Sequence, residues 1–364
     1  MAQPPFRAWM FSFPRRADLA LQASQMIPPD LALRIRKMPK AELHLHFEGA
    51  FRWSTVRELN PGARSLSDPP PWTRRPFSKF DEFRAVFHDY LQPATGSEER
   101  IERHMFEVLE DLARQNVRYV EPILYLPFHM AKGLSVPEVL LAVRRGIERG
   151  ERAYPIRCRL ILGLVRGPSA GKETARAREA LELAGSGGWG LVAGFDVMDD
   201  DRLGIDPEFS ALYREAKNMG LRLKVHAGEY AGPQVVSDAL EKLEARHLSH
   251  GVRAVEDSGL LRELSARGVW FHTCPTSNLM LGVARDYSSH PIKRLLEARC
   301  NVTLNSDDPL LFGATITDEF LCAADEMEFP AEQIKHLALN GMRASLLPQS
   351  DRAKYEREIE QLFA

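Results

Sequence analysis

The protein chain has 364 residues, of which 44% are hydrophobic and 27% are charged, and its formal net charge is −2. This is the balance of an ordinary globular protein, and it lacks the strongly basic character of nucleic-acid-binding proteins. A chain of this length buries most of its apolar surface and needs no disulfide or metal merely to fold. Its 4 cysteines are scattered without a CxxC pair, which favours a reducing compartment and argues against a disulfide framework.

The first residues, 1–36, are predicted to form an extension of the main domain, which we place at residues 37–364. The apolar stretch "FRAWMFSFPRR" is short and interrupted by arginine, and it lacks the cleavage site of a signal peptide. A short helical pattern follows it and is closed by Pro39. No run approaches the roughly 18 apolar residues of a membrane span. We therefore expect a cytoplasmic protein without a membrane segment.

Two segments after the first predicted strand have a distinct composition. Residues 61–78 are rich in proline and show little periodicity, so a loop is expected there. Residues 77–91 then place phenylalanines at helical spacing. We expect these rings to pack against the core, and the alternative is a lid over a substrate. The sequence leaves that choice open.

From residue 40 onward, short apolar runs alternate with longer helical patterns. The strand candidates are residues 41–47, 117–125, 158–165, 191–197, 221–227, 246–250, 268–274 and 300–306. The helix candidates between them include residues 98–116, 136–153, 169–184, 207–219, 233–245, 253–267 and 291–299. Strands that alternate with helices indicate βαβ units and a parallel sheet. Their number predicts an α/β fold of the closed (β/α)₈ TIM type, with an N-terminal helical extension. An open doubly wound sheet is the alternative, but no GxGxxG motif follows any of the strands.

Polar side chains gather at the predicted C-terminal ends of four strands, where barrel enzymes build their active sites. The stretch "AELHLHF" carries His44 and His46, "KVHAGE" carries His226 and Glu229, "HLSHG" carries His250, and "LNSDDP" carries Asp307 and Asp308. His44 and His46 point to the same side, because side chains alternate along a strand. Imidazoles and carboxylates are costly to bury without partners, and one metal ion satisfies several of them at once.

The types of these residues indicate which metal they would hold. Two imidazoles about 7 Å apart on one strand can grip a single cation. With His226 and a carboxylate from the eighth strand they make a nitrogen-rich set that suits zinc, and suits iron, nickel or cobalt less well. Such a metal lowers the pKa of a bound water towards about 7, so the residues predict metal-assisted hydrolysis. Glu229 and His250 remain as the groups that hold or accept a proton.

Each residue also has an ordinary structural interpretation. Glu229 could accept hydrogen bonds from backbone N–H groups at a helix terminus, and Asp308 before Pro309 could start a turn. A single histidine in an apolar run is often a satisfied core residue. The occurrence of the whole set at strand ends favours a site over these separate explanations. Four histidines receive no role: His129, His247, His272 and His290.

In this order, the motifs resemble the adenosine deaminase family. The matching stretches are "PKAELHLHFEGA" (39–50), "KVHAGE" (224–229), "HLSHG" (247–251), "CPTSN" (274–278) and "LNSDDP" (304–309), with "GFDVMDDD" (194–201) as a looser match. The resemblance extends over about residues 38–345.

The resemblance implies a hydrolase with one Zn²⁺ per chain that converts the 6-amino group of an adenine-type purine, in adenosine or a related nucleoside, and releases ammonia. The implied zinc ligands are His44, His46, His226 and Asp307. Glu229 would protonate purine N1, and His250 would orient or deprotonate the attacking water beside Asp307. Asp308 would hydrogen-bond N7, while Glu48 would contact the sugar and His46 would adjoin the substrate. The implied partner is a small purine, without nucleic acid or membrane, and the oligomeric state is not predicted.

The chain departs from the family where the substrate is recognised. Relatives commonly read "DLAGDE" after the fourth strand, and alignment on Asp196 puts Asp199 at the glycine. A side chain there would crowd or re-aim one edge of the pocket. The second-strand motif "EVRYSP" of relatives is "EPILYLP" here. The substrate could therefore be another adenine compound, such as 6-aminodeoxyfutalosine, adenine or an N6-substituted adenine.

Two other functions compete with purine deamination. One is a barrel metallohydrolase that cleaves an amide or a phosphoester. Two-metal enzymes of that kind often need a bridging carboxylated lysine, and Lys224 lies close to the end of its strand. The other is a non-catalytic barrel, against which the complete set of ligands, acid and base argues.

Overall fold

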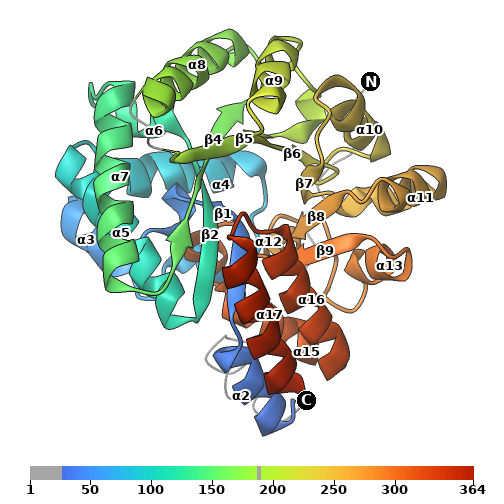
Figure 1. Ribbon diagram of the computed structural model, residues 1–364. Coiled ribbons are helices and arrows are strands. Elements are labelled where there is room, and N and C mark those ends of the chain that lie inside the picture. Colours follow the sequence, from blue (N-terminus) through green and yellow to red (C-terminus); the bar gives the residue numbers. More distant parts are fainter. Residues whose placement is uncertain (1–26, 187–189) are drawn as a thin grey trace.

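The computed structural model describes residues 27–186 and 190–364. In it, parallel strands run side by side in the order β1-β2-β4-β5-β6-β7-β8-β9, with β3 paired to β2. Their bounds are β1 Lys40–His46, β2 Val117–Leu124, β3 Arg157–Cys158, β4 Leu160–Val165, β5 Val192–Met198, β6 Arg222–Ala227, β7 His247–His250, β8 Trp270–Thr273 and β9 Asn301–Leu304. A parallel bridge between Leu45 of β1 and Asp307, which follows β9, joins the last strand of this order to the first. The predicted (β/α)₈ barrel is therefore confirmed (Figure 1).

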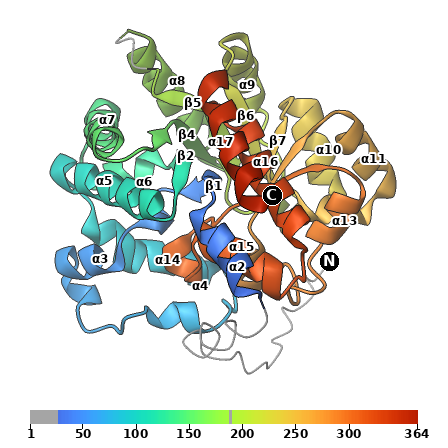
Figure 2. The same cartoon turned by 60° about the horizontal axis from the view of Figure 1, so that its bottom comes forward.

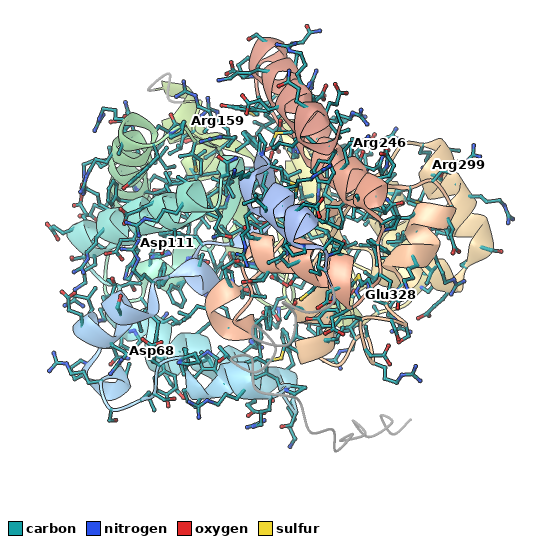
Figure 3. All side chains as sticks on the ribbon, turned by 90° about the horizontal axis from the view of Figure 1, so that it is seen from below. Asp68, Asp111, Arg159, Arg246, Arg299 and Glu328 are labelled. Carbon is teal, nitrogen blue, oxygen red and sulfur yellow. The ribbon has the colours of Figure 1, made fainter. Side chains whose placement is uncertain are left out.

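Helices form the outer layer of the barrel (Figures 1 and 2). The main ones are α5 Glu98–Arg114, α7 Val136–Ala153, α8 Ala170–Ser186, α9 Glu208–Asn218, α10 Pro233–Lys242, α11 Ser258–Ala266, α13 Ile292–Glu297, α15 Ile316–Asp325, α16 Ala331–Ala344 and α17 Gln349–Phe363. Charged side chains such as Arg246, Arg299 and Glu328 are exposed at the periphery (Figure 3). None of the described helices is long and apolar enough to cross a membrane.

Three elements differ in detail from the sequence prediction. The predicted strand 158–165 is divided into β3 and β4 at Arg159, whose N–H bonds the carbonyl of Val120. The predicted helix 253–267 starts as the 3₁₀ turn η8 (Val252–Glu256), and Asp257 then caps α11 by accepting from two backbone N–H groups. The predicted helix over 77–91 is the short α4 (Phe80–Val86), which continues into the π-helical turn η5 (Phe87–Leu91).

The predicted extension, residues 1–36, lies outside the described residues up to residue 26. Its last part forms α2 (Pro29–Lys37), which starts with proline in its first turn, a position where the missing N–H costs nothing. The helix packs beside α15 (Figure 2) and buries Ile35 completely.

The first strand divides its side chains between two faces, as its alternation predicts. Leu43 and Leu45 are fully buried in the main hydrophobic cluster with Phe47. His44 and His46 therefore face the other way, into the barrel. Because β1 ends at His46, both histidines also lie near the C-terminal end of the barrel, where the strands of a (β/α)₈ barrel build the active site.

Candidate metal and catalytic site

The four predicted metal ligands converge at the C-terminal ends of the strands. His44 and His46 come from β1, His226 from β6, and Asp307 from the segment after β9. His46 Nε2 lies 3.2 Å from His226 Nε2. One oxygen of Asp307, Oδ1, lies 3.5 Å from His44 Nε2 and 3.3 Å from His46 Nε2. The side chains thus place nitrogen and oxygen atoms around one point, although they are up to 263 residues apart in the chain.

Hydrogen bonds on the far side of two rings show that these atoms are electron-pair donors. His44 Nδ1 lies 3.2 Å from the carbonyl of His272, which can only accept, so Nδ1 carries the hydrogen. His44 Nε2 is then bare, and it is buried without a hydrogen-bond partner. His226 Nδ1 likewise donates to Asp196 Oδ1 at 2.9 Å, which leaves its Nε2 bare. A buried acceptor without a partner, such as His44 Nε2, costs about 1–3 kcal/mol, and a cation at this point would satisfy it together with His226 Nε2.

Asp196 is a partner of the site that the sequence used only as an alignment anchor. Besides His226 it accepts from Ser249 Oγ at 2.6 Å, inside the barrel. Burial alone would raise the pKa of Asp196, but the neighbouring His226, Lys224 and Ser249 outweigh it and lower that pKa. Asp196 is therefore an anion that fixes the ring of His226.

Glu229 faces the metal position across the cavity. Its backbone N–H donates to Asp201 Oδ2 at 2.9 Å, and the N–H groups of Tyr230 and Ala231 donate to the other oxygen, so Asp201 holds the whole turn. Burial, together with the negative charges of Asp307 and Asp201, raises the pKa of Glu229 well above its ordinary value. These causes favour the protonated form of Glu229, which can donate a hydrogen bond.

His250 ends β7 between Glu229 and Asp307. Its Nε2 lies 3.4 Å from Glu229 Oε1 and 3.7 Å from Asp307 Oδ2. The backbone of His250 has φ 67°, in the left-handed region that few side chains adopt. Burial lowers the pKa of His250 to about 3, which makes the ring neutral.

Asp308 lies beside the ligands and is almost completely buried, with Oδ1 lacking a partner. Burial and the charge of Asp307 raise its pKa well above the ordinary range. A Cβ atom on Gly49 would lie 1.8 Å from Asp308 Oδ1, so only glycine fits at position 49. The predicted turn is also present, because the carbonyl of Asp308 accepts from Leu311 and Phe312 N–H.

Glu48 lies in the 3₁₀ turn η2 (Glu48–Ala50) directly after β1. Its Oε1 accepts from the N–H of Tyr125 at 2.9 Å and from His129 Nε2 at 3.0 Å. His129, to which the sequence gave no role, therefore holds one carboxylate oxygen of Glu48 in place.

A cavity of about 200 Å³ joins these groups. Its inner lining includes His46, His226, Glu229, His250, Asp307, Asp308 and Glu48, and its outer lining is mainly apolar, with Phe80, Phe83, Phe87, Phe128, Tyr125, Val165, Met198 and Leu281. Phe80, Phe83 and Phe87 of the segment 77–91 thus contribute a wall of the cavity, whereas Phe77 is buried in the hydrophobic core. Phe83 also stacks on Phe312, so the same segment packs against the core.

Asp199, which the sequence resemblance aligned with a glycine, lines this cavity. It keeps a backbone that glycine favours, with φ 74°, and adds a carboxylate to the lining. Asp199 Oδ2 pairs with Arg84 Nη2 of α4 at 3.3 Å. The Asp199 carboxylate therefore joins the lining of the cavity and is tied to α4.

Lys224, the candidate for a bridging lysine, does not reach the site. It is fully buried within the barrel, donates to the carbonyl of Leu43 and pairs with Glu121 at 3.7 Å. A two-metal centre built on this lysine is not supported.

Comparison with known proteins agrees with these motifs. A family model described as Adenosine deaminase matches residues 39–362. The chain is 30% identical to an adenosine deaminase of Xenopus tropicalis, over 86% of this chain and 92% of that one. It is 32% identical to an adenine deaminase of Ralstonia nicotianae, over 92% of this chain and 97% of that one. A crystal structure of an adenine deaminase from Arthrobacter aurescens superposes with a TM-score of 0.75 at 26% identity, covering 89% of this chain and 98% of that one.

Proposed function

This chain belongs to the adenosine deaminase family of hydrolytic deaminases, and we propose that it is a zinc enzyme that converts the 6-amino group of an adenine-type purine to a 6-oxo group with release of ammonia. One observation supports the proposal above all others. His44 Nε2 is bare and lies 3.5 Å from Asp307 Oδ1, His226 Nε2 is bare and lies 3.2 Å from His46 Nε2, and Glu229, whose pKa is raised, lines the same cavity.

The proposed metal ligands are His44, His46, His226 and Asp307. Three imidazoles and one carboxylate are a ligand set typical of catalytic zinc, whereas calcium and magnesium prefer more oxygens. When bound, zinc would act as a Lewis acid that makes water a better nucleophile at neutral pH.

Glu229 is the proposed general acid. An adenine ring resists attack at the carbon that bears the amino group, because that carbon is electron-rich. Transfer of the Glu229 proton to ring nitrogen N1 withdraws electron density from this carbon. The raised pKa of Glu229 keeps the proton in place until the ring arrives.

The reacting water is proposed to lie between Asp307 and His250. Both side chains lie beside the metal position, and the outer aromatic wall limits access of bulk water. Asp308 is proposed to hydrogen-bond N7. Its raised pKa favours the protonated form, which would donate there, and Gly49 leaves room for its side chain.

The substrate beyond the purine ring has two candidates. Adenosine or a related adenine nucleoside would place its sugar toward Glu48. Tyr125 and His129 both bond Oε1 of Glu48, so its other oxygen, Oε2, can accept from a sugar hydroxyl. Asp199 supports a second candidate, an adenine compound other than adenosine, because its carboxylate lines the cavity at the position where the sequence resemblance leads us to expect glycine.

The test is a screen for ammonia release by the zinc-loaded protein. The panel comprises adenine, adenosine, deoxyadenosine, 5′-modified adenosines such as 6-aminodeoxyfutalosine, and N6-substituted adenines. Turnover of at least one compound by the wild type, and its loss in Glu229→Gln, is expected. The exposed Glu241→Gln variant is the matched control and should keep full activity. Absence of turnover across the panel would contradict the proposed function and favour an amide or phosphoester substrate.

A further inference from the structure

A row of three buried side chains extends from His250 away from the cavity. Asn278, in α12 (Pro275–Met280), has Nδ2 at 3.2 Å from His250 Nδ1. Its other amide atom, Oδ1, lies 3.1 Å from His290 Nε2. His290 precedes α13, and its Nδ1 lies 3.2 Å from the backbone nitrogen of Ile292. All three side chains belong to residues that are at most 2% exposed.

The backbone of Ile292 sets the direction of every hydrogen bond in this row. The Ile292 N–H donates to His290 Nδ1, so that nitrogen is an acceptor. A neutral imidazole has one N–H, which must then be on Nε2 and donates to Asn278 Oδ1. The amide group of Asn278 consequently turns its N–H toward His250 Nδ1, which accepts.

The opposite orientation of the amide is chemically excluded. It would place an amide N–H against His290 Nε2 while Ile292 already donates to Nδ1. Both ring nitrogens would then be acceptors, and the ring would have to be an imidazolate anion. Burial lowers the pKa of His290 to about 3, so the ring is neutral at physiological pH, and its single hydrogen lies on Nε2.

We infer that Asn278 and His290 are positioning residues that hold His250 with its hydrogen on Nε2, so that His250 enters the cavity as a hydrogen-bond donor. The donor faces Glu229 Oε1 at 3.4 Å and Asp307 Oδ2 at 3.7 Å. In this form His250 has no lone pair directed at the reacting water. It stabilises negative charge on the oxygen that adds to the purine, and it does not take a proton from the water. This role in turnover rests on the proposed function, whereas the position of the hydrogen does not.

A packing role can be separated from this positioning role. The backbone carbonyl of Asn278 also accepts from Val283 and Ala284 N–H, and side-chain substitutions leave those bonds intact. Asn278→Asp keeps the shape but offers only acceptors, so it should move the hydrogen of His250 to Nδ1. His290→Leu removes the donor to Asn278, and His290→Gln supplies a new donor in the form of an amide.

The experiment combines histidine ¹⁵N NMR with steady-state kinetics on zinc-loaded protein. In the wild type we expect His250, assigned with a His250→Gln variant, to show a protonated Nε2 and an unprotonated Nδ1. Asn278→Asp should reverse that pattern. His290→Leu and Asn278→Asp should lower kcat by about 10–100-fold, the usual cost of losing an outer partner of a site residue, with KM changed less than about 3-fold. His290→Gln should recover most of the lost kcat.

The matched control is a pair of the same kind. On α16 the exposed His336 lies 3.3 Å from the buried Asn340, so only the histidine of this control pair is at the surface, and His336→Leu should change neither the spectrum of His250 nor kcat. A hydrogen on Nδ1 of wild-type His250 would overturn the inference, as would an Asn278→Asp variant with unchanged tautomer and kcat. If the wild type turns over no purine, the proposed function fails, and the NMR pattern still decides the inference. If His290→Leu does not fold, Asn278→Asp and His290→Gln decide it.

Discussion

Substitution of Glu229 by glutamine tests how a buried acid serves the reaction. The change keeps the size of the side chain and removes the transferable proton. Because the backbone of the Glu229 turn is held by Asp201, the variant should fold normally and keep its metal. General acid catalysis is worth about 10²–10⁴-fold, so kcat should fall by that factor, which corresponds to about 3–5 kcal/mol of transition-state stabilisation.

The same variant should be more stable than the wild type near neutral pH. Burial raises the folded-state pKa of Glu229, so the folded protein binds a proton more tightly than the unfolded chain does. The contribution of Glu229 to the free energy of unfolding is therefore largest at pH values below its unfolded pKa. That stabilisation decreases as the pH rises from the unfolded pKa through the folded pKa. Glutamine does not titrate, so the stability difference should grow in favour of Glu229→Gln as the pH is raised from about 4.5.

The assay measures kcat, zinc content and thermal unfolding between acidic and neutral pH. Glu241→Gln, an exposed change of the same chemistry, is the control for all three. A Glu229→Gln variant with kcat within about threefold of the wild type would refute the role of Glu229 as an acid, since the expected loss is at least about 10²-fold. Loss of zinc together with activity would show that Glu229 supports the metal instead.

Three further predictions concern the ligands, the glycine beside Asp308 and the mouth of the cavity. His226→Ala should abolish stoichiometric zinc binding, measured by elemental analysis, because it removes a bare Nε2 that Asp196 orients; unchanged metal content would contradict the ligand assignment. Gly49→Ala should lower kcat sharply while the protein stays folded by circular dichroism, because its Cβ would lie 1.8 Å from Asp308 Oδ1; full activity would show that Asp308 can move without consequence. Asp199→Gly should change KM among the panel substrates more than kcat, because Asp199 lines the cavity and is not a proposed ligand, acid or base. It should change the free energy of unfolding by less than about 1 kcal/mol, because the Arg84–Asp199 pair is partly exposed; equal effects on all substrates would remove Asp199 from substrate selection.

The barrel and the grouping of its polar residues could be predicted because both depend on local patterns. Alternating strands and helices indicate a parallel barrel, and a parallel barrel brings all strand ends to one edge. His44, His226 and Asp307 therefore lie at the same end of any such barrel. The break at Arg159 could not be foreseen, because it depends on pairing with Val120 of another strand.

The partners that hold these residues were not predicted, because they depend on contacts between distant parts of the chain. Asp196 meets His226 only through the register of β5 and β6, in which Asp196 lies opposite Lys224. In the sequence, Asn278 was only part of the matching stretch "CPTSN", and His290 received no role. Their connection to His250 depends on how α12 and the segment before α13 pack behind β7.

The most direct test of the central claim is to follow the reaction in water enriched in heavy oxygen. Zinc-loaded enzyme and a compound from the panel that is turned over would be incubated, and the purine product would be analysed by mass spectrometry together with the ammonia released. The proposed mechanism predicts a 6-oxo purine that carries one solvent-derived oxygen for each ammonia, and no product from the metal-free protein. Equal turnover without metal, or a product that leaves the 6-amino group intact, would contradict it.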